Sequence, residues 1–585
     1  MLPDNLSCNP PASNQMPISI PKGSLRNVIL FGMSAGLLLF GGLGARNLWG
    51  SEDRWAEISR NILKSGDWFH PVINGTVYFD KPLFSYWWIV VSEWITGTLD
   101  EFTIRLPSVM AGIIVLWATF SIGRRLWDRQ VAWIALWLLL SSYGFLFWTH
   151  TAAADMGNAA FIMLAVAWFF RYRDSRAFRH YLVFWLICGA GAQMKGLTAF
   201  VVPALLLLPW LVRERRLLLH LNLPHALAAL AGIAFFLLPY LGAALLPLPE
   251  GYLLPRNELS GLDLVIRENV VRFFQPFDHR DPVYSYLYHL PRLLLPWVFV
   301  FIAALVFALR NYREAAWQER WLLEAILLVF LFFTLSGSRR WYYILPIVPF
   351  CSLLMASYLL QGPAGYLRSA ALAATQALLA VAGLVLVASP LVLIYKDMPV
   401  SAAMWLMSAG LLLLLPLIWV KRARIAGYTG TAQMGVQFAG LVAAAVLLMW
   451  ALFTVVLPYS DNFRQDKAFA LQLKQQLGGD DRVAFYRHER ADVVFYLGQD
   501  YAVPLLDALS LHEVGDTTVL IVEQQNIDEL ASRFPELMEV GPLLRQVEYE
   551  WQGDRSKYNL SAWRLPDAAS GQQQPVEPGQ KDAGT

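Results

Sequence analysis

Two adjoining stretches near the N-terminus decide the fold: NVILFGMSAGLLLFGGLG (residues 27–44) and WGSEDRWAE (residues 49–57). The first has no charged side chain and is long enough to cross a membrane as a helix. The second places three carboxylates and an arginine directly after it, and the polar stretches SGDWFHP (65–71) and YFDKP (78–82) follow. Charged side chains beside a membrane are costly unless they do chemistry or bind a polar headgroup. We therefore expect the active site in this first loop.

The composition is typical of a multi-pass membrane protein. The 585 residues are 57% hydrophobic and 15% charged, whereas a soluble domain is about 25% charged. A net charge of +2 gives no electrostatic reason to expect a nucleic-acid partner. The three cysteines, Cys8, Cys188 and Cys351, lie far apart in the chain. Their spacing fits neither a disulfide framework nor a zinc site.

Thirteen apolar segments have about the length of a membrane span. They are residues 26–44, 103–123, 131–148, 152–171, 180–194, 197–213, 225–247, 287–309, 321–336, 341–360, 370–395, 402–420 and 436–458. The apolar run 82–97 is shorter and contains Glu93, so we expect it to lie in the membrane interface. Residues 54–64 are also expected to form a helix in the interface, because Trp55, Ile58 and Ile62 recur at helical spacing on one face.

Basic residues indicate which way the bundle faces. The short loops on one side carry seventeen Lys and Arg but only five acids, which predicts that this side is cytoplasmic. The polar tail 1–25 then lies inside, while the first loop (45–102) and the loop 248–286 lie outside. The tail lacks the order of a cleaved signal, so the first apolar run is expected to remain as an anchor.

Beyond Tyr459 the composition becomes that of a soluble domain. The pattern predicts an amphipathic helix followed by several strands. The helix is expected over 462–477 and the strands over 483–486, 493–497, 518–523, 544–551 and 558–564. A tail rich in Gln, Pro and Gly (567–585) is predicted to be disordered. The fold class is thus an all-α polytopic membrane bundle of about thirteen spans (26–458) with a small extracytoplasmic α/β domain (459–566).

Three acids are candidates for chemistry. Glu52 and Asp53 follow the first span, where a carboxylate can act as a general base or hold a divalent metal. They fit equally well as acids that stabilise the first turn of a solvated helix. Asp155 lies just inside an apolar segment and is flanked by alanines, a position that indicates a function.

Basic and polar groups on the predicted outer side are candidates for binding an anionic headgroup. They are Lys81, Lys195, Arg267, Arg272, His279, Arg280, Arg339 and Arg340. The alternative is that each one anchors the chain at the interface. That alternative is weaker for Lys195 and for Arg339–Arg340, which are expected in very short loops. No P-loop, Rossmann glycine pattern or Ser-His-Asp order is present, so an enzyme of soluble nucleotides is not supported.

Several short motifs occur together in this chain. They are RWAEISR (54–60), SGDW (65–68), YFDKP (78–82), Asp155-Met156, Lys195-Gly196, YILP (343–346) and FYLG (495–498). As a set they resemble the membrane glycosyltransferases of the GT-C class. More narrowly, they resemble the bacterial family of the lipid A aminoarabinose transferase, which is related to protein O-mannosyltransferases. The likeness covers about residues 26–360 and is thinner beyond.

The resemblance implies a sugar donor of the polyprenyl-phosphate type, used outside the bacterial inner membrane with inversion at the anomeric carbon. The acceptor would be lipid A, another glycan or a protein. Lys81 matches the family lysine near the lipid phosphate, joined by Lys195, Arg272, Arg339 and Arg340, and Asp155 matches the second functional acid. Arg54, Trp68, Tyr78, His279 and Tyr342 would line the substrate pocket. The resemblance leaves a divalent metal open, with no readable ligand set.

The chain departs from the family pattern at the first acid. The family reads Asp-Glu before x-Arg-Tyr-Ala-Glu, and alignment through Arg54 places Ser51-Glu52 at that pair. Either Glu52 or Asp53 takes over as base, or the acceptor needs less activation. We favour Glu52, because its position is an acid in the family pattern.

A transporter or flippase of lipid-linked sugars is the competing function, because it would also need basic residues at headgroup depth. Such a protein is expected to have paired hydropathy halves or broken helices at matching positions. The sequence has no clear halves.

Overall fold

A computed structural model describes most of the chain. The described residues are 25–254, 263, 267, 271, 281–362, 365–394, 400–425, 430–461, 464–506, 517–548, 554 and 556–565. The predicted tail 1–25 (except Leu25, the first residue of a helix), the predicted tail 567–585, and Cys8, Arg272, His279 and Arg280 lie outside them. The chain divides into two compact units. One, the helical unit, comprises Met1–Ala45, Asp80–Leu245 and Leu259–Tyr459, and the other, the composite unit, comprises Arg46–Phe79, Leu246–Glu258 and Ser460–Thr585.

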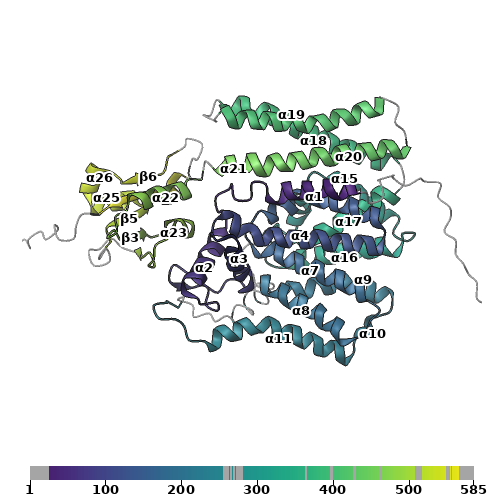
Figure 1. The fold of residues 1–585 in the computed structure, drawn as a ribbon, viewed down its shortest axis with the longest axis horizontal. Helices are drawn as coiled ribbons and strands as arrows, with labels where there is room; N and C mark the ends of the chain where they lie inside the picture. The colour runs from purple at the N-terminus through teal and green to yellow at the C-terminus, as the bar shows by residue number, and fades with distance from the viewer. Residues whose placement is uncertain are drawn as a thin grey trace, which may run out of the picture. The chain divides into compact units, whose positions relative to one another are not determined.

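Helices make up the described part of the helical unit (Figure 1). They are α1 (Leu25–Phe40), α3 (Phe84–Thr96), α4 (Glu101–Leu126), α5 (Arg129–Leu140), α6 (Tyr143–Thr149), α7 (Ala154–Tyr172), α8 (Phe178–Lys195), α9 (Thr198–Arg213), α10 (Leu217–His220), α11 (Leu223–Leu245), α14 (Ser285–Leu293), α15 (Val298–Arg310), α16 (Trp317–Leu335), η2 (Leu345–Ile347), α17 (Val348–Gln361), α18 (Tyr366–Ile394), α19 (Val400–Ile425), α20 (Gly430–Ala451), η3 (Leu452–Val456) and α21 (Leu457–Ser460).

Each of the thirteen predicted segments falls on a helix or on successive helices. Among the described residues, five helices are long and apolar enough to cross a membrane. The number rises to seven if the bent pairs α5–α6 (65°) and α14–α15 (117°) each count as one span. Three shorter apolar helices accompany them. The helical, apolar character of the bundle is therefore established, and the total of thirteen spans stays a prediction.

Close helix packing places the ends of α7 and α8 beside each other. The two helices are antiparallel neighbours, so the start of α7 lies by the end of α8. On its other side α8 packs tightly against α11. A Cβ added to Gly232 would stand 2.6 Å from the carbonyl oxygen of Trp185, so only glycine allows the two backbones to approach this closely.

The first part of the composite unit is a helix followed by a small hairpin. Helix α2 (Glu52–Ser65) precedes β1 (Val72–Ile73) and β2 (Thr76–Val77), which pair antiparallel. The hairpin turn is Asn74–Gly75, and both residues have positive φ (47° and 77°), as a tight Asn-Gly turn requires. Leu253 pairs with the second strand: it accepts from the Val77 N–H and donates to the Gly75 carbonyl, both at 2.9 Å.

The second part is a five-stranded mixed sheet of order β4-β3-β5-β7-β6. Its strands are β3 (Val483–Tyr486), β4 (Leu505–Leu506), β5 (Val519–Glu523), β6 (Leu544–Arg545) and β7 (Leu560–Arg564). Strand β3 is parallel to β4 and β5, whereas β7 is antiparallel to β5 and β6. Its helices are α22 (Asp466–Gln476), α23 (Ala491–Leu497), η5 (Gln524–Asn526), α25 (Ile527–Arg533) and α26 (Pro535–Val540).

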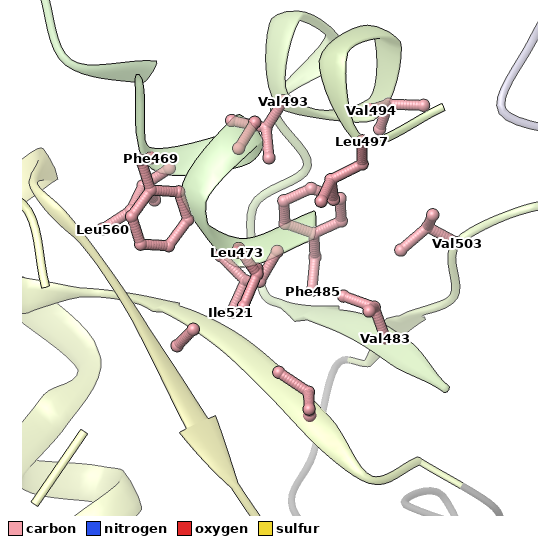
Figure 2. Packing of buried hydrophobic residues seen from close by; sticks show 13 residues of the cluster. Phe469, Leu473, Val483, Phe485, Val493, Val494, Leu497, Val503, Ile521 and Leu560 are labelled. Atoms are coloured by element: carbon pink, nitrogen blue, oxygen red, sulfur yellow. The ribbon is translucent and has the colours of Figure 1, made fainter. Parts of the chain in front are cut away.

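Side chains alternate between two cores on the faces of this sheet. Figure 2 shows Val483 and Phe485 of β3 pointing into the core that α22 and α23 cover. The intervening residues Ala484 and Tyr486 pack in the opposite core. Both faces of β3 and β5 are therefore buried, which accounts for their unbroken apolar sequence.

The predicted helix 462–477 and the predicted strands 483–486, 518–523 and 558–564 coincide with α22, β3, β5 and β7. The predicted strand 493–497 is wrong, because this segment is helix α23. Its buried residues Val493, Val494 and Leu497 have helical spacing, and Gly498 ends the helix with φ of 61°. A short apolar run is ambiguous between strand and helix, and here the following glycine was the better signal.

Candidate active site

The first candidate group lies in the helical unit and is an ion pair between Asp155 and Lys195. Asp155 is in the first turn of α7, and Lys195, which we expected in a short loop, is the last residue of α8. The Lys195 ammonium donates a hydrogen bond to Asp155 Oδ1, and the two side chains are only 16% and 9% exposed. An acid at a helix N-terminus and a base at a C-terminus each gain from the helix dipole.

Two tyrosine rings complete this group. The Lys195 Nζ atom lies 4.7 Å from the centre of the Tyr342 ring and 4.6 Å from that of Tyr343. Such cation–π contacts stabilise a cation that is largely removed from water. The structure thus brings together three predicted site residues, Asp155, Lys195 and Tyr342. We call Asp155, Lys195, Tyr342 and Tyr343 the lysine site.

Further aromatic and basic side chains adjoin the lysine site. Trp148 contacts Tyr342 (ring centres 4.5 Å apart) and Trp341 (5.1 Å), and the guanidinium of Arg292 lies 4.5 Å from the centre of the Trp341 ring. Sequence reasoning missed Arg292. The available signal was its position inside a predicted span, where an arginine is rare and functional by default.

The two adjacent arginines have different surroundings. Arg340 lies with its guanidinium 5.9 Å from the centre of the Tyr342 ring, so it adjoins the lysine site. Arg339 donates to the backbone carbonyls of Thr334 (3.0 Å) and Asp281 (2.9 Å). Those two bonds give Arg339 a role in holding the loop before η2.

Lys81 forms an ion pair with the preceding residue, Asp80. Its ammonium contacts Asp80 Oδ1 at 2.8 Å and the Asp80 carbonyl oxygen at 3.1 Å, and its side chain is 21% exposed. The predicted role of Lys81 near a lipid phosphate stays a prediction.

The second candidate group lies in the composite unit, in the first turn of α2. Glu52 is fully buried, and its Oε2 accepts a hydrogen bond from the Trp49 N–H at 3.1 Å. Ser51 makes no side-chain capping bond to the helix. Glu52 therefore reaches back to the chain that enters the helix, as acids near a helix start often do.

Asp53 is influenced by charged residues that accompany the five-stranded sheet of the composite unit. Burial raises the pKa of Asp53, and the nearby charges of Arg54 and Arg490 oppose that rise. Arg490 also binds Asp466 (3.0 Å) and lies 3.7 Å from Asp492. Burial, together with the charge of Asp466, raises the pKa of Asp492 to about 7. Asp53 thus lies in the field of Arg490 and of two further acids, Asp466 and Asp492. Its predicted catalytic role stays a prediction.

The predicted pocket residues Arg54 and Tyr78 also meet in the composite unit. The Arg54 guanidinium donates to the Tyr78 hydroxyl at 2.7 Å and lies 5.9 Å from the centre of its ring. Trp68 lies half-buried between α2 and β1. Within the described ranges, no group of three or more His, Cys, Asp or Glu side chains is arranged to hold a metal ion.

Comparison with known proteins begins with a family model. The model of dolichyl-phosphate-mannose-protein mannosyltransferases matches residues 80–240. Two similar curated proteins are undecaprenyl phosphate-alpha-4-amino-4-deoxy-L-arabinose arabinosyl transferases. The one from Yersinia enterocolitica is 29% identical over 326 residues, and one from Sodalis glossinidius is 32% identical over 327 residues. Each alignment covers 54% of this chain and 56% of the relative, so the chain spans about half the length of the curated relatives it matches.

A solved structure extends the likeness over nearly the whole chain. ArnT from Cupriavidus metallidurans bound to undecaprenyl phosphate superposes with a TM-score of 0.66 and 20% identity, covering 92% of this chain and 98% of that one. Its apo state gives a TM-score of 0.64. The chain has the fold of a GT-C glycosyltransferase. The resemblance inferred from the sequence motifs is confirmed.

Proposed function

We propose that the chain is an integral-membrane glycosyltransferase of the bacterial inner membrane. It moves a sugar from a polyprenyl-phosphate donor to an acceptor outside the cytoplasm, with inversion at the anomeric carbon. The observation that carries this proposal is the lysine site: a largely buried ammonium, held by one carboxylate and two tyrosine rings, in a fold shared with a protein solved with undecaprenyl phosphate.

The chemistry is a direct displacement. The bond between the anomeric carbon and the phosphate oxygen breaks as the acceptor oxygen bonds to that carbon. Lys81 and Lys195, with Arg272 and Arg340, stabilise the negative charge left on the lipid phosphate. The acceptor proton passes to a carboxylate, which we assign to Glu52 because its position is an acid in the family pattern. Asp155 supports the reaction by orienting the Lys195 ammonium.

The sugar and the acceptor follow from the names of the relatives. We infer an aminoarabinose-type sugar as the first donor to test and lipid A as the first acceptor, with another glycan or a protein as the alternatives. The excess of basic residues on one side of the bundle supports a cytoplasmic N-terminal tail and a periplasmic composite unit. The domain boundaries near 45, 102 and 459 belong to the same proposal.

A transfer assay with purified protein tests the function. The protein in detergent receives a labelled polyprenyl-phosphate sugar and lipid A, and we expect label in the acceptor together with release of the lipid phosphate. Mass spectrometry of envelope glycolipids and glycoproteins from a deletion strain identifies the natural acceptor. Movement of the donor across a vesicle membrane without transfer would favour the flippase instead. The relatives named above are all transferases.

Reporter fusions at residues 425 and 470 test the topology. We expect a cytoplasmic signal at 425 and a periplasmic signal at 470. A cytoplasmic signal at 470 would contradict the proposed orientation.

A further inference from the structure

Arg60 of α2 binds the last turn of α23. Its NH1 group donates to the carbonyl oxygens of Phe495 (2.9 Å) and Val494 (3.4 Å), and its guanidinium lies 5.7 Å from the centre of the Phe495 ring. Carbonyls in the last turn of a helix have no partner within the helix and carry partial negative charge. Arg60 therefore gives the Phe495 carbonyl a partner and places a positive charge at the C-terminal end of a helix that lies 435 residues further along the chain, where the Val494 carbonyl also accepts from the Gly498 N–H at 3.1 Å.

The guanidinium is fixed from its other side as well. Its NH2 group donates to Glu57 Oε1 at 2.7 Å, and the Glu57 side chain is 1% exposed. The amide of Asn61 donates to the same Glu57 oxygen (2.9 Å) and to the carbonyl of Val72 in β1 (3.0 Å). Arg60 is thus the centre of a connected group that joins α2, β1 and α23. Connected hydrogen bonds that are largely removed from water specify one geometry.

A second contact joins the chain that enters α2 to the last turn of α23. The Leu48 N–H, just before α2, donates to the Tyr496 hydroxyl at 3.1 Å. The turn that carries Glu52 is therefore held against α23 from its entering side, and the second half of α2 is held through Arg60.

We propose that Arg60 is a positioning residue, which clamps α2 onto α23 and thereby holds the acidic first turn of α2 in the orientation that sugar transfer needs. The proposal rests on the function proposed above. It also explains why RWAEISR (54–60) and FYLG (495–498) occur in one chain, since Arg60 and Phe495 are the two sides of one contact.

Lys64 supplies a matched control on the same helix. One turn beyond Arg60, it forms a 3.0 Å ion pair with Asp500, whose side chain is 97% exposed. Exposed pairs of this kind contribute little to stability. Removing Lys64 deletes a contact between the same two segments without touching the clamp.

The experiment compares Arg60→Ala, Arg60→Lys and Lys64→Ala in the detergent-purified full chain. Amide hydrogen exchange is followed in residues 52–58 and 491–497, and kcat and KM are measured with a polyprenyl-phosphate sugar. In Arg60→Ala we expect exchange in both segments to rise by about ten- to a hundred-fold, since a hydrogen bond to a charged group is lost. We expect kcat to fall by a similar factor with an unchanged KM. Arg60→Lys should show a smaller rise in exchange and a smaller fall in kcat than Arg60→Ala. Lys64→Ala should match the wild type in both measurements.

Two outcomes overturn the proposal: normal exchange and normal kcat in Arg60→Ala, or a change confined to the KM for the donor. If Arg60→Ala does not fold, Arg60→Lys decides, because it must still show intermediate exchange in both segments. If the wild type transfers no sugar, the proposed function fails, whereas the exchange measurement still decides whether Arg60 is the clamp.

Discussion

The helical unit and the composite unit hold their charged side chains by different means. In the helical unit, Asp155 and Lys195 pair at the facing ends of neighbouring helices, 40 residues apart in sequence. In the composite unit, Arg60 and Arg490 each bind several groups, and the partners of Arg60 include residues 435 positions away. The lysine site sets its ion pair among aromatic rings, whereas the composite unit distributes charge through a network of hydrogen bonds. Substitutions in the lysine site should act mainly through charge, and those around Arg60 should also alter geometry.

The largest effect is expected at Glu52. The substitution Glu52→Gln keeps the shape of the side chain and removes its charge, so turnover should fall by roughly 10²–10⁴-fold, as for a lost general base. Initial rates at equal membrane expression measure this effect. Asp53→Asn is expected to cost less, and Ser51→Ala very little. Near-normal rates in both acid variants, beside an inactive Asp155→Asn, would move the base to the helical unit.

The lysine site is tested by breaking its ion pair. Asp155→Asn leaves the Lys195 ammonium largely buried with a neutral partner, and we expect roughly a 10²-fold loss of turnover. Loss of one partner of a buried pair also costs up to about 3–5 kcal/mol of stability. Thermal unfolding in detergent should show that the double variant Asp155→Asn/Lys195→Met regains part of that stability. A double variant less stable than Asp155→Asn would show that the two groups act independently.

Lys81 and Lys64 provide a direct comparison of the two units. Lys81→Ala should weaken donor use by roughly ten- to a hundred-fold, because one charge-assisted contact to the lipid phosphate is lost. Lys64→Ala removes an exposed pair with Asp500 and an exposed hydrogen bond to the Gln499 carbonyl. Competition with unlabelled polyprenyl phosphate measures donor binding in both variants. Equal donor use would remove Lys81 from the phosphate role.

The smallest effect concerns pH and the cluster around Arg490. Because the folded pKa of Asp492 is about 7, above the usual value near 3.8, the folded state keeps a proton that the unfolded state releases between these values. The contribution of Asp492 to stability should therefore be largest at acidic pH and fall as pH rises from about 4 to 7. In Asp492→Asn this fall should shrink by about 1–3 kcal/mol. Amide exchange in β3 and β5 of the full chain at pH 5 and pH 8 measures it, and identical slopes in both proteins would disprove it.

Sequence predicted the helices of the bundle well because apolar length is a local property. It did not predict that two of the segments bend, by 65° and 117°. The residues at these breaks, Ser141–Ser142 and Pro296, were visible in the sequence, but hydropathy reports length and not direction. In the composite unit, the wrong prediction of a strand at 493–497 had the same origin. Apolar content alone does not distinguish a short strand from a short helix.

The site was predicted as separate residues and not as contacts. Asp155 stood out as an acid inside an apolar segment, and Lys195 as a lysine in an unexpected place. No local pattern indicates that they bind each other, nor that Arg54 binds Tyr78. Arg60 shows the limit most clearly, because its hydrogen-bond partners in α23 are backbone carbonyls, and any sequence that forms a helix at that place would supply them.

The three-part make-up of the composite unit also has a consequence for synthesis. Its first part ends at Phe79 and its last begins at Ser460, so about 380 residues are translated between them. At about 5–20 residues per second, the first loop waits roughly 20–80 s for the partners of Arg60 and Asn74. A ribosome that stops before Ser460 would release a chain with every candidate acid but without α23, the helix that Arg60 binds. On the proposed function, we expect such a shortened chain to be inactive even though it contains every acid of the candidate site.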